Sequence, residues 1–305
     1  SRRQRQMCIR DRLKAVTAEN RIFTDEPMKK HTTFRVGGPA DILVQPKGTE
    51  LAAVIRLCRK YDVPYQVIGN GSNLLVGDRG IRGLVIEMLS KEDEICVEDD
   101  CITVGAGMLL SKTANRAAEH GLTGMEFAAG IPGRIGGAVV MNAGAYGGEM
   151  KDILTAVTVL DQEGNEKILS AEELELGYRT SCILKKGYIV TGAKIKLKHG
   201  EETAIRARME ELKKQRVEKQ PLEYPSAGST FKRPEGYFAA KLIEDAGLKG
   251  CARGGAQVSE KHAGFVVNKG DATAKDVCEL TDYIKSEVME KFGVGLELEV
   301  VKVGF

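Results

Sequence analysis

The feature that most constrains this chain is a glycine-rich stretch at residues 125–150, which reads MEFAAGIPGRIGGAVVMNAGAYGGEM. Glycine costs conformational entropy on folding, so a dense run is expected where the backbone takes a positive φ or where a ligand presses against it. The stretch is also apolar, whereas flexible linkers are rich in serine and polar. It therefore predicts a cradle for a ligand. Its glycines are Gly130, Gly133, Gly136, Gly137, Gly144, Gly147 and Gly148.

A second, shorter glycine loop, GNGSN at residues 69–73, directly follows two apolar residues. Backbone amides in such loops form concave sites for anions, and two of these loops in one chain indicate an extended ligand that carries phosphates. A plain β-turn is the alternative for the shorter loop. Neither loop reads GxGxxG or GxxxxGK[ST], which argues against a Rossmann-type NAD site and against an ATPase.

Composition narrows the class of protein further. The chain has 305 residues, enough for two or three domains. Its 45 basic and 43 acidic residues are interspersed and leave a net charge of +2, so charge gives no reason to expect a nucleic-acid or membrane partner. We find no apolar run near the ~20 residues of a membrane span and no signal-peptide core. We therefore expect a cytoplasmic protein without an obligate protein partner.

Cysteine and histidine usage argues against disulfides and metals. The seven cysteines are scattered, odd in number and without a CxxC pair, which predicts reduced thiols and no zinc site. The four histidines lie far apart in the sequence. We expect no bound metal.

Hydrophobic periodicity predicts an α+β chain. A strand at 41–44, a helix that Thr49 caps and Pro64 closes, and a strand at 65–68 form a β-α-β unit. This unit delivers the shorter glycine loop at the carboxyl end of its second strand, where α/β sheets bind ligands. From residue 84 onward, short β-rich segments and one helix near 111–120 predict a second layer.

The remaining sequence predicts a separate C-terminal part. A polar helix at about 201–216 leads to Pro221, near which we place a domain boundary. Beyond it we expect helices and strands to alternate, with helices near 237–246 and 273–291 and strands at 264–267 and 296–303. The first residues, SRRQRQMCIRDR, lack a helical or strand period and resemble a translated sequencing adapter, so residues 1–20 are treated as outside any domain.

Seven motifs in one order resemble the UDP-N-acetylenolpyruvoylglucosamine reductase (MurB) family. They span nearly everything after residue 27. They are HTTFRVGGPAD (31–41), IGNGSNLLVGD (68–78), AGIPGRIGGAVVMNAGAYGGEM (129–150), YRTS (178–181), AGSTFKRP (227–234), AAKLIEDAGLKG (239–250) and LELEV (296–300).

The resemblance implies an FAD-binding module of the vanillyl-alcohol-oxidase/PCMH type with two subdomains, at 21–83 and 84–200. An α+β substrate-binding domain at 201–305 would follow, with the helix at 201–218 as connector. The two glycine loops would hold the FAD pyrophosphate and line the isoalloxazine. Neither loop contains His or Cys, so we expect non-covalent FAD. His31 is the nearest candidate for a covalent tether and is expected to be a structural or solvent-facing residue. The implied cofactor-binding residues are Gly69, Asn70, Gly71, Ser72, Asn73, Gly130, Ile131, Pro132, Gly133, Gly136, Gly137, Asn142, Ala143 and Gly144.

The implied reaction is the NADPH-dependent reduction of UDP-N-acetylglucosamine enolpyruvate to UDP-N-acetylmuramate, in bacterial peptidoglycan precursor synthesis. Three residues match the family's catalytic positions. Ser229 would donate a proton, Arg179 would stabilise the enolate and carboxylate, and Glu299 would orient the site or share the proton chemistry. Glu297 has the same strand parity, and Glu299 is chosen because the family's glutamate directly precedes the valine.

Positive and polar groups are also expected at the nucleotide sugar, whose diphosphate is dianionic. The implied substrate-binding residues are Tyr146, Tyr178, Arg216, Lys219, Lys232, His262 and Asn268. The short connection between YRTS and the next strand resembles the compact subtype, which lacks the longer substrate-loop insertion. Two alternatives stay open from the residues alone. They are an FAD-dependent oxidase of the same fold, and a non-catalytic protein that binds nucleotide sugars.

Overall fold

The structure is a computed structural model and describes residues 2–91 and 94–305. The residues at 1, 92 and 93, which belong to the expected N-terminal segment and second subdomain, lie outside it. Two compact units make up the chain. Unit 1 consists of Ser1–Thr24, Ile42–Asn70 and Gly83–Arg216, and unit 2 of Asp25–Asp41, Gly71–Arg82 and Val217–Phe305.

A four-stranded sheet with the order β1-β2-β5-β3 underlies the first part of unit 1. Its strands are β1 (Ile22–Pro27), β2 (Pro39–Val44), β5 (Ile81–Glu87) and β3 (Tyr65–Ile68). The expected β-α-β alternation is confirmed, with β5 lying between β2 and β3 and pairing parallel with β3. Helix α2 (Glu50–Lys60) packs on this part because its i, i+3, i+4, i+7 positions are all apolar and buried.

The start of α2 differs from the expected cap. Thr49 has helical dihedrals (φ −69°, ψ −13°) and makes no side-chain cap hydrogen bond. Glu50 acts instead: its carboxylate accepts the amide of Lys47 at 2.9 Å. A residue that is already helical cannot turn its hydroxyl onto the amides of the first turn.

Residues 2–13, in which we found no helical or strand period, form helix α1 (Arg2–Leu13). Ile9 and Leu13 lie one turn apart and are 5% and 0% exposed, in the same apolar core as α2. Four residues of spacing place both side chains on one face, and this single pair was too short a pattern to recognise among charged neighbours.

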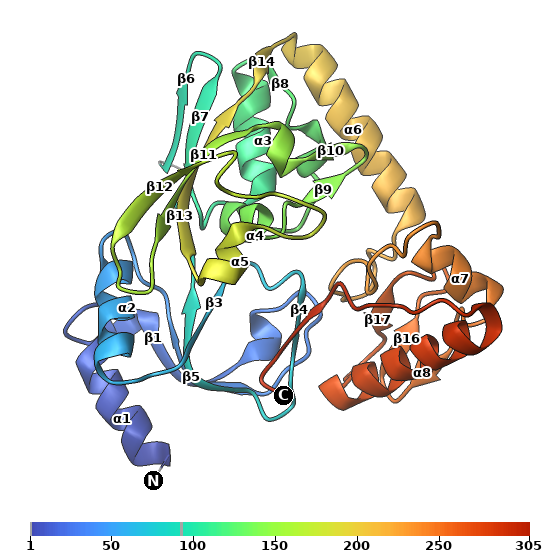
Figure 1. Cartoon of the computed structure of the whole chain (residues 1–305), viewed down its shortest axis with the longest axis horizontal. Coiled ribbons are helices and arrows are strands. Elements are labelled where there is room, and N and C mark those ends of the chain that lie inside the picture. The colour runs from blue at the N-terminus through green and yellow to red at the C-terminus, as the bar shows by residue number, and fades with distance from the viewer. Residues whose placement is uncertain (1, 92–93) are drawn as a thin grey trace. The chain divides into compact units, whose positions relative to one another are not determined.

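The second part of unit 1 is a five-stranded antiparallel sheet with the order β12-β11-β13-β7-β6 (Figure 1). It confirms the expected β-rich region and its helix near 111–120. Helix α4 packs against β13 and β7, and α3 lies against β8 and β6. The elements of this part are β6 (Ile95–Glu98), β7 (Cys101–Gly105), α3 (Leu110–Glu119), β8 (Leu122–Thr123), α4 (Ile135–Val140), β9 (Gly144–Ala145), β10 (Gly148–Glu149), β11 (Leu154–Leu160), β12 (Glu166–Ser170), α5 (Cys182–Lys186), β13 (Ile189–Lys196), β14 (Lys198–His199) and α6 (Glu202–Lys219).

Unit 2 contains a three-stranded antiparallel sheet, β15-β16-β17, with helix α8 against β15 and β16 and helix α7 packed on α8 (Figure 1). Helix α8 begins with a capping box between Thr273 and Asp276 and ends at Gly293, which has φ +66°. A parallel pair, β4 with β18, completes the unit. The elements are β4 (Leu74–Val76), α7 (Ala239–Asp245), β15 (Ala252–Arg253), β16 (Ala256–Val258), β17 (Val266–Asn268), α8 (Ala274–Phe292) and β18 (Val301–Val303).

The last expected strand is shorter than the pattern at 296–303 suggested, because only β18 forms a ladder. Residues before it make one isolated antiparallel bridge, from Leu298 to Phe231. The expected boundaries of the two FAD-binding subdomains, after residues 83 and 200, stay a prediction. No helix in residues 2–91 and 94–305 combines the length and the apolar composition that a membrane crossing needs.

Candidate functional site

The two glycine loops meet within unit 1. Asn70 of the shorter loop donates its side-chain amide to the carbonyl oxygen of Pro132, at 2.8 Å. A Cβ on Gly69 would lie 3.3 Å from the Cβ of Arg134. The first residues of the shorter loop are therefore in contact with the longer run.

Most glycines of the longer run permit close contact rather than an unusual backbone conformation. A Cβ on Gly136 would lie 3.2 Å from Ala106, and one on Gly148 would lie 2.6 Å from the Phe127 ring. Among the described glycines of the run, only Gly147 has a positive φ, at +86°. A Cβ on Gly137 would meet no described heavy atom within 4 Å, and this residue is exposed. Gly137 thus leaves an open surface where a flat group could lie.

Arg216 and Tyr146 lie at the edge of this run, also in unit 1. The Arg216 side chain reaches within 3.2 Å of the place where a Gly130 Cβ would stand, so a larger residue there would have to displace it slightly. Burial lowers the pKa of Arg216, while nearby Tyr146 acts in the opposite direction. Tyr146 is 37% exposed and has φ +52°.

The fully buried Asn142 connects the longer run to the YRTS turn. Its side-chain nitrogen donates to the Glu149 carboxylate at 2.7 Å and to the Gly177 carbonyl oxygen at 3.1 Å. Its side-chain oxygen accepts the Lys151 amide at 2.9 Å. The Asn142 side chain, expected at the cofactor, is therefore used to hold protein segments together.

Tyr178 and Arg179 occupy the tip of a tight turn whose ends are tied by the backbone of Gly177 and Thr180. The guanidinium of Arg179 lies 5.1 Å from the centre of the Tyr178 ring. Arg179 is half-buried and has φ +54°, which is unfavourable for a long side chain. Such strained conformations are often found at functional sites.

Unit 2 brings the segments of Ser229 and Glu299 side by side. The Glu299 amide donates to the carbonyl oxygen of Thr230 at 2.9 Å, next to the bridge between Phe231 and Leu298. Ser229 is exposed although the residues on its C-terminal side are buried. Asn73, from the shorter glycine loop, donates its side-chain amide to the Glu299 carbonyl oxygen at 3.1 Å. Three predicted residues thus share one hydrogen-bonded backbone region.

The structure also separates the two candidate glutamates. Glu297 is exposed and forms an ion pair with Lys232 at 3.2 Å. Glu299 is half-buried. Parity could not choose between them in the sequence, and the structure shows that they differ in burial.

Other predicted residues of unit 2 serve different purposes. Asn268 is buried; its amide nitrogen donates to the Phe34 carbonyl oxygen at 3.2 Å and its oxygen accepts the Ala272 amide at 3.1 Å. These bonds assign its side chain a structural task. The Nδ1 atom of His262 accepts the Gly264 amide at 3.1 Å, and burial lowers the histidine's pKa. His262 is therefore neutral at pH 7, with its proton on Nε2.

The rest of the shorter loop and its neighbours also lie in unit 2. A Cβ on Gly71, which has φ +59°, would lie 2.1 Å from the His31 carbonyl oxygen, so glycine is required there. His31 contacts Glu26 through Nε2 at 3.2 Å, as a structural residue would. Ser72 follows in the loop, and Lys219 is exposed at the end of α6.

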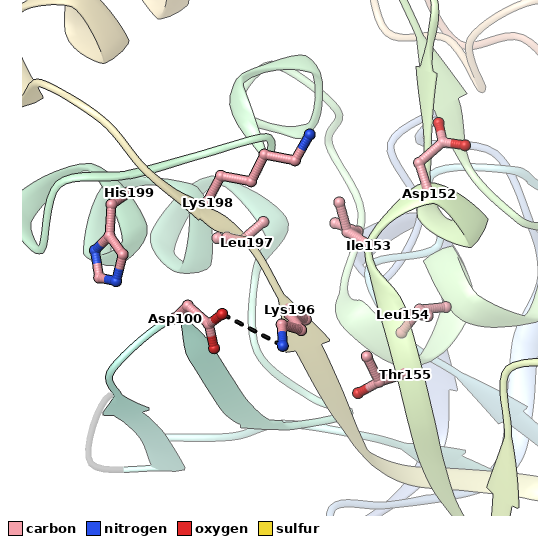
Figure 2. A pocket seen from close by; sticks show the side chains of 9 residues that line it. All are labelled: Asp100, Asp152, Ile153, Leu154, Thr155, Lys196, Leu197, Lys198 and His199. Carbon is pink, nitrogen blue, oxygen red and sulfur yellow. Dashed lines mark ion pairs between the residues drawn. The ribbon is translucent and has the colours of Figure 1, made fainter.

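A hollow of about 530 Å³ in unit 1 contains none of these residues. Figure 2 shows that Asp100 and Lys196 point toward one another across its floor, where they form an ion pair at 3.4 Å. Its rim carries both acidic and basic side chains, so it selects no ligand charge. Among the described residues, no group of three or more His, Cys, Asp or Glu is placed to hold a metal.

Sequence reasoning missed Arg134, which lies inside the longer run. Its guanidinium donates to the Gly107 carbonyl oxygen at 2.6 Å and is largely withdrawn from water. The signal was a charged residue in an otherwise apolar glycine stretch. Its surroundings come from residues 27 and more positions away, which no local pattern reveals.

Comparison with known proteins places this geometry in a family. The profile described as "UDP-N-acetylenolpyruvoylglucosamine reductase, C-terminal domain" matches residues 220–303, and the one described as "FAD binding domain" matches residues 40–170. The UDP-N-acetylenolpyruvoylglucosamine reductase of Agathobacter rectalis is 55% identical over 295 residues, which cover 93% of this chain and 94% of the relative. That of Clostridium botulinum is 54% identical over 290 residues, which cover 95% and 94%.

A solved structure agrees with these relatives. The crystal structure of UDP-N-acetylenolpyruvylglucosamine reductase (MurB) from Thermus caldophilus superimposes with a TM-score of 0.78 at 42% identity. It covers 91% of this chain, and 97% of its own chain is matched. The predicted α+β fold, with its FAD-binding module and C-terminal domain, is confirmed, as is the expectation of an FAD- and NADPH-dependent oxidoreductase. The oxidase and the non-catalytic alternatives are not supported. The chain belongs to the UDP-N-acetylenolpyruvoylglucosamine reductase family, whose reaction supplies a precursor of peptidoglycan.

Proposed function

We propose that Ser229, Arg179 and Glu299 perform the chemistry by which this chain reduces UDP-N-acetylglucosamine enolpyruvate to UDP-N-acetylmuramate. The observation that carries the proposal is the backbone connection in unit 2. The segment of Ser229 pairs with that of Glu299, and Asn73 of a glycine loop bonds to Glu299. A proton donor, a carboxylate and part of the expected cofactor cradle are thereby held in fixed relation.

The residues of the two glycine loops fit FAD. Gly137 leaves an open surface for a flat ring, and Asn70 joins the two loops at Pro132. We propose that these loops hold the cofactor without a covalent bond. When bound, FAD relays hydride from NADPH to the methylene carbon of the enolpyruvyl group.

Each of the three residues then has a distinct task. Hydride addition at the methylene carbon builds negative charge on the adjacent carbon and on the attached carboxylate. Arg179 stabilises this charge with its guanidinium, since charge-assisted hydrogen bonds are strongest where charge develops. Ser229 gives its hydroxyl proton to the carbanionic carbon, which completes the lactyl ether. Glu299 orients the serine and substrate and helps to return a proton to the serine from water.

The nucleotide sugar is proposed to contact a second set of residues. Its diphosphate is dianionic and calls for cations, which Lys219 and Arg216 supply. Neutral His262 offers an Nε2–H donor rather than a charge. Tyr146, Tyr178 and Lys232 are proposed for the sugar and the carboxylate. Asn268 contributes by fixing the loop around residue 270, because its own side chain is bonded within the protein.

Separate measurement of the two half-reactions tests the catalytic roles. Ser229→Ala should leave reduction of the bound flavin by NADPH nearly unchanged and slow its reoxidation by the enolpyruvyl substrate by roughly 10²-fold or more in stopped-flow absorbance. Ser286→Ala, which changes an exposed serine on α8, is the control and should alter neither phase. Equal slowing of both phases by Ser229→Ala would refute its role as proton donor.

The two glutamates offer a matched pair. Glu299→Gln should slow reoxidation strongly, whereas Glu297→Gln should change it by less than about threefold because Glu297 is exposed to solvent. If Glu297→Gln has the larger effect, the assignment to Glu299 is wrong.

We also propose that the chain works in the bacterial cytoplasm, without a nucleic-acid or membrane partner. All seven cysteines are free, which suits a reducing compartment. Fractionation of cells that carry a tagged chain checks this directly, and recovery with membranes would contradict it.

A further inference from the structure

Arg134 is held firmly at the junction of the two glycine loops. Its backbone forms an antiparallel bridge with Leu109. On its two sides, Leu110 donates its amide to Gly133 and Ile135 donates its amide to Met108, at 3.0 and 2.9 Å. The side chain then donates from one terminal nitrogen to the Gly107 carbonyl oxygen at 2.6 Å. The arginine and its guanidinium are therefore held against residues 107–110.

The charge of this guanidinium is poorly compensated. Its Nε atom is buried and has no hydrogen-bond partner among the described residues. Burial lowers the pKa of Arg134, and the nearby charge of Glu87 acts in the opposite direction. Glu87 already accepts a hydrogen bond from Gln45 at 2.7 Å. A buried N–H of a charged group that lacks an acceptor is costly, which indicates that an anionic partner is missing.

The shorter glycine loop is shaped around the same side chain. A Cβ on Gly69 would lie 3.3, 3.7 and 3.6 Å from the Cβ, Cγ and Cδ atoms of Arg134. Asn70 bonds to Pro132, two residues before the arginine. The Arg134 side chain thus packs against Gly69, where the two loops meet.

We propose that Arg134 is a cationic ligand of the FAD diphosphate. A planar guanidinium matches phosphate oxygens with two parallel hydrogen bonds, and a dianionic group supplies the acceptor that Nε lacks. The proposal rests on FAD binding by the glycine loops. It adds a side-chain cation to a cradle otherwise made of backbone and small residues.

Ligand binding to the apoprotein tests this role without any turnover. The variants are Arg134→Met and Arg134→Lys. Arg116→Met is the control, because Arg116 is a partly exposed residue of α3 that pairs with Glu119 and lies outside both glycine loops. Flavin fluorescence gives dissociation constants for FAD and for riboflavin, which has no phosphate. Displacement of FAD by ADP, which has the diphosphate but no flavin ring, gives a third constant.

Arg134→Met should raise the dissociation constants of FAD and ADP by about 10- to 100-fold, the range expected for charge-assisted hydrogen bonds, and that of riboflavin by less than about threefold. Arg134→Lys should raise the dissociation constant of FAD by about 3- to 10-fold, because lysine keeps the charge but lacks the planar guanidinium. Raising NaCl should weaken FAD binding less steeply in Arg134→Met than in wild type. Arg116→Met should match wild type throughout.

Other outcomes overturn the proposal in recognisable ways. Equal weakening of FAD and riboflavin would mean that Arg134 acts on the flavin ring or only maintains the loops. If Arg134→Met does not fold by circular dichroism, the same comparison of ligands with Arg134→Lys decides. Wild-type protein that binds no FAD would refute the cofactor cradle itself, whereas tight FAD binding by every variant would refute Arg134 alone.

Discussion

Replacing Asn142 by alanine tests the connection between the glycine run and the Tyr178–Arg179 turn. The asparagine side chain is fully buried and makes three hydrogen bonds within the protein. One reaches the Glu149 carboxylate, one the Gly177 carbonyl oxygen, and one comes from the Lys151 amide. Alanine would remove all of them at once and leave their partners without the bond.

The expected loss follows from these contacts. A hydrogen bond to a charged group contributes about 1.5–3 kcal/mol, and each neutral one about 1 kcal/mol. Asn142 also has φ +42°, which alanine adopts less readily than asparagine, at a cost of about 0.5–1 kcal/mol. We therefore expect Asn142→Ala to lower the free energy of unfolding by about 4–6 kcal/mol.

Urea unfolding of the FAD-free protein measures this loss, and Asn115→Ala is the matched control. Asn115 makes a single exposed hydrogen bond to the Ser111 carbonyl oxygen at 2.9 Å, so its removal should change stability by less than about 0.5 kcal/mol. Where Asn142→Ala still folds, reoxidation by the substrate should slow more than reduction by NADPH, because Arg179 loses its support. A loss below about 1 kcal/mol would refute the structural task given to the Asn142 side chain.

Three further predictions concern stability and reactivity. Gly148→Ala should cost about 1–3 kcal/mol because the new methyl would lie 2.6 Å from a ring carbon, whereas Gly137→Ala should not lower apoprotein stability but should weaken FAD binding in a fluorescence titration. Arg21 holds the pKa of Glu50 at about 2 against an ordinary value of 4.5, so this pair's stabilisation is complete above pH 4.5 and is lost as the pH falls to 2. Glu50→Gln should therefore cost about 2 kcal/mol at pH 7 and little at pH 2, by urea unfolding. Burial raises the pKa of Cys58 to about 12, so a thiol reagent at pH 8 should modify the exposed cysteines and leave Cys58 unmodified until the protein unfolds, as peptide mass spectrometry would show.

The sequence was a sufficient guide wherever structure depends on local periodicity. Helix α2 was predicted from four apolar positions, which lie on its buried face. Strand β3 occupies the residues expected for it. Thr49 failed as a cap because its backbone is already helical, which composition cannot reveal. Helix α1 was missed because only Ile9 and Leu13 mark its buried face.

The sequence predicted a list of site residues, but it did not reveal what each side chain contacts. Family motifs identified Asn142 and Asn268 as important, yet their amides bond to segments that are distant in sequence, so only the structure shows that both side chains hold the protein together. Glu297 and Glu299 were equivalent by parity but differ in burial: Glu297 is exposed and pairs with Lys232, whereas Glu299 is half-buried. Arg134 was overlooked because its environment is built by Gly69 and Gly107. Such contacts depend on how loops meet, which a single sequence does not encode in any local pattern.

Some residues with a positive φ in and beside the longer glycine run are not glycine. The longer run is rich in glycine, the residue that tolerates a positive φ, yet among its described residues the strained non-glycine positions are Asn142 and Tyr146, with Arg179 in the adjoining turn. Each such conformation costs of order 1 kcal/mol that glycine would avoid. Asn142 recovers this cost through its three hydrogen bonds, whereas Tyr146 is more than one-third exposed and Arg179 lies at the tip of a turn. The three hydrogen bonds of Asn142 therefore offset the cost of its positive φ.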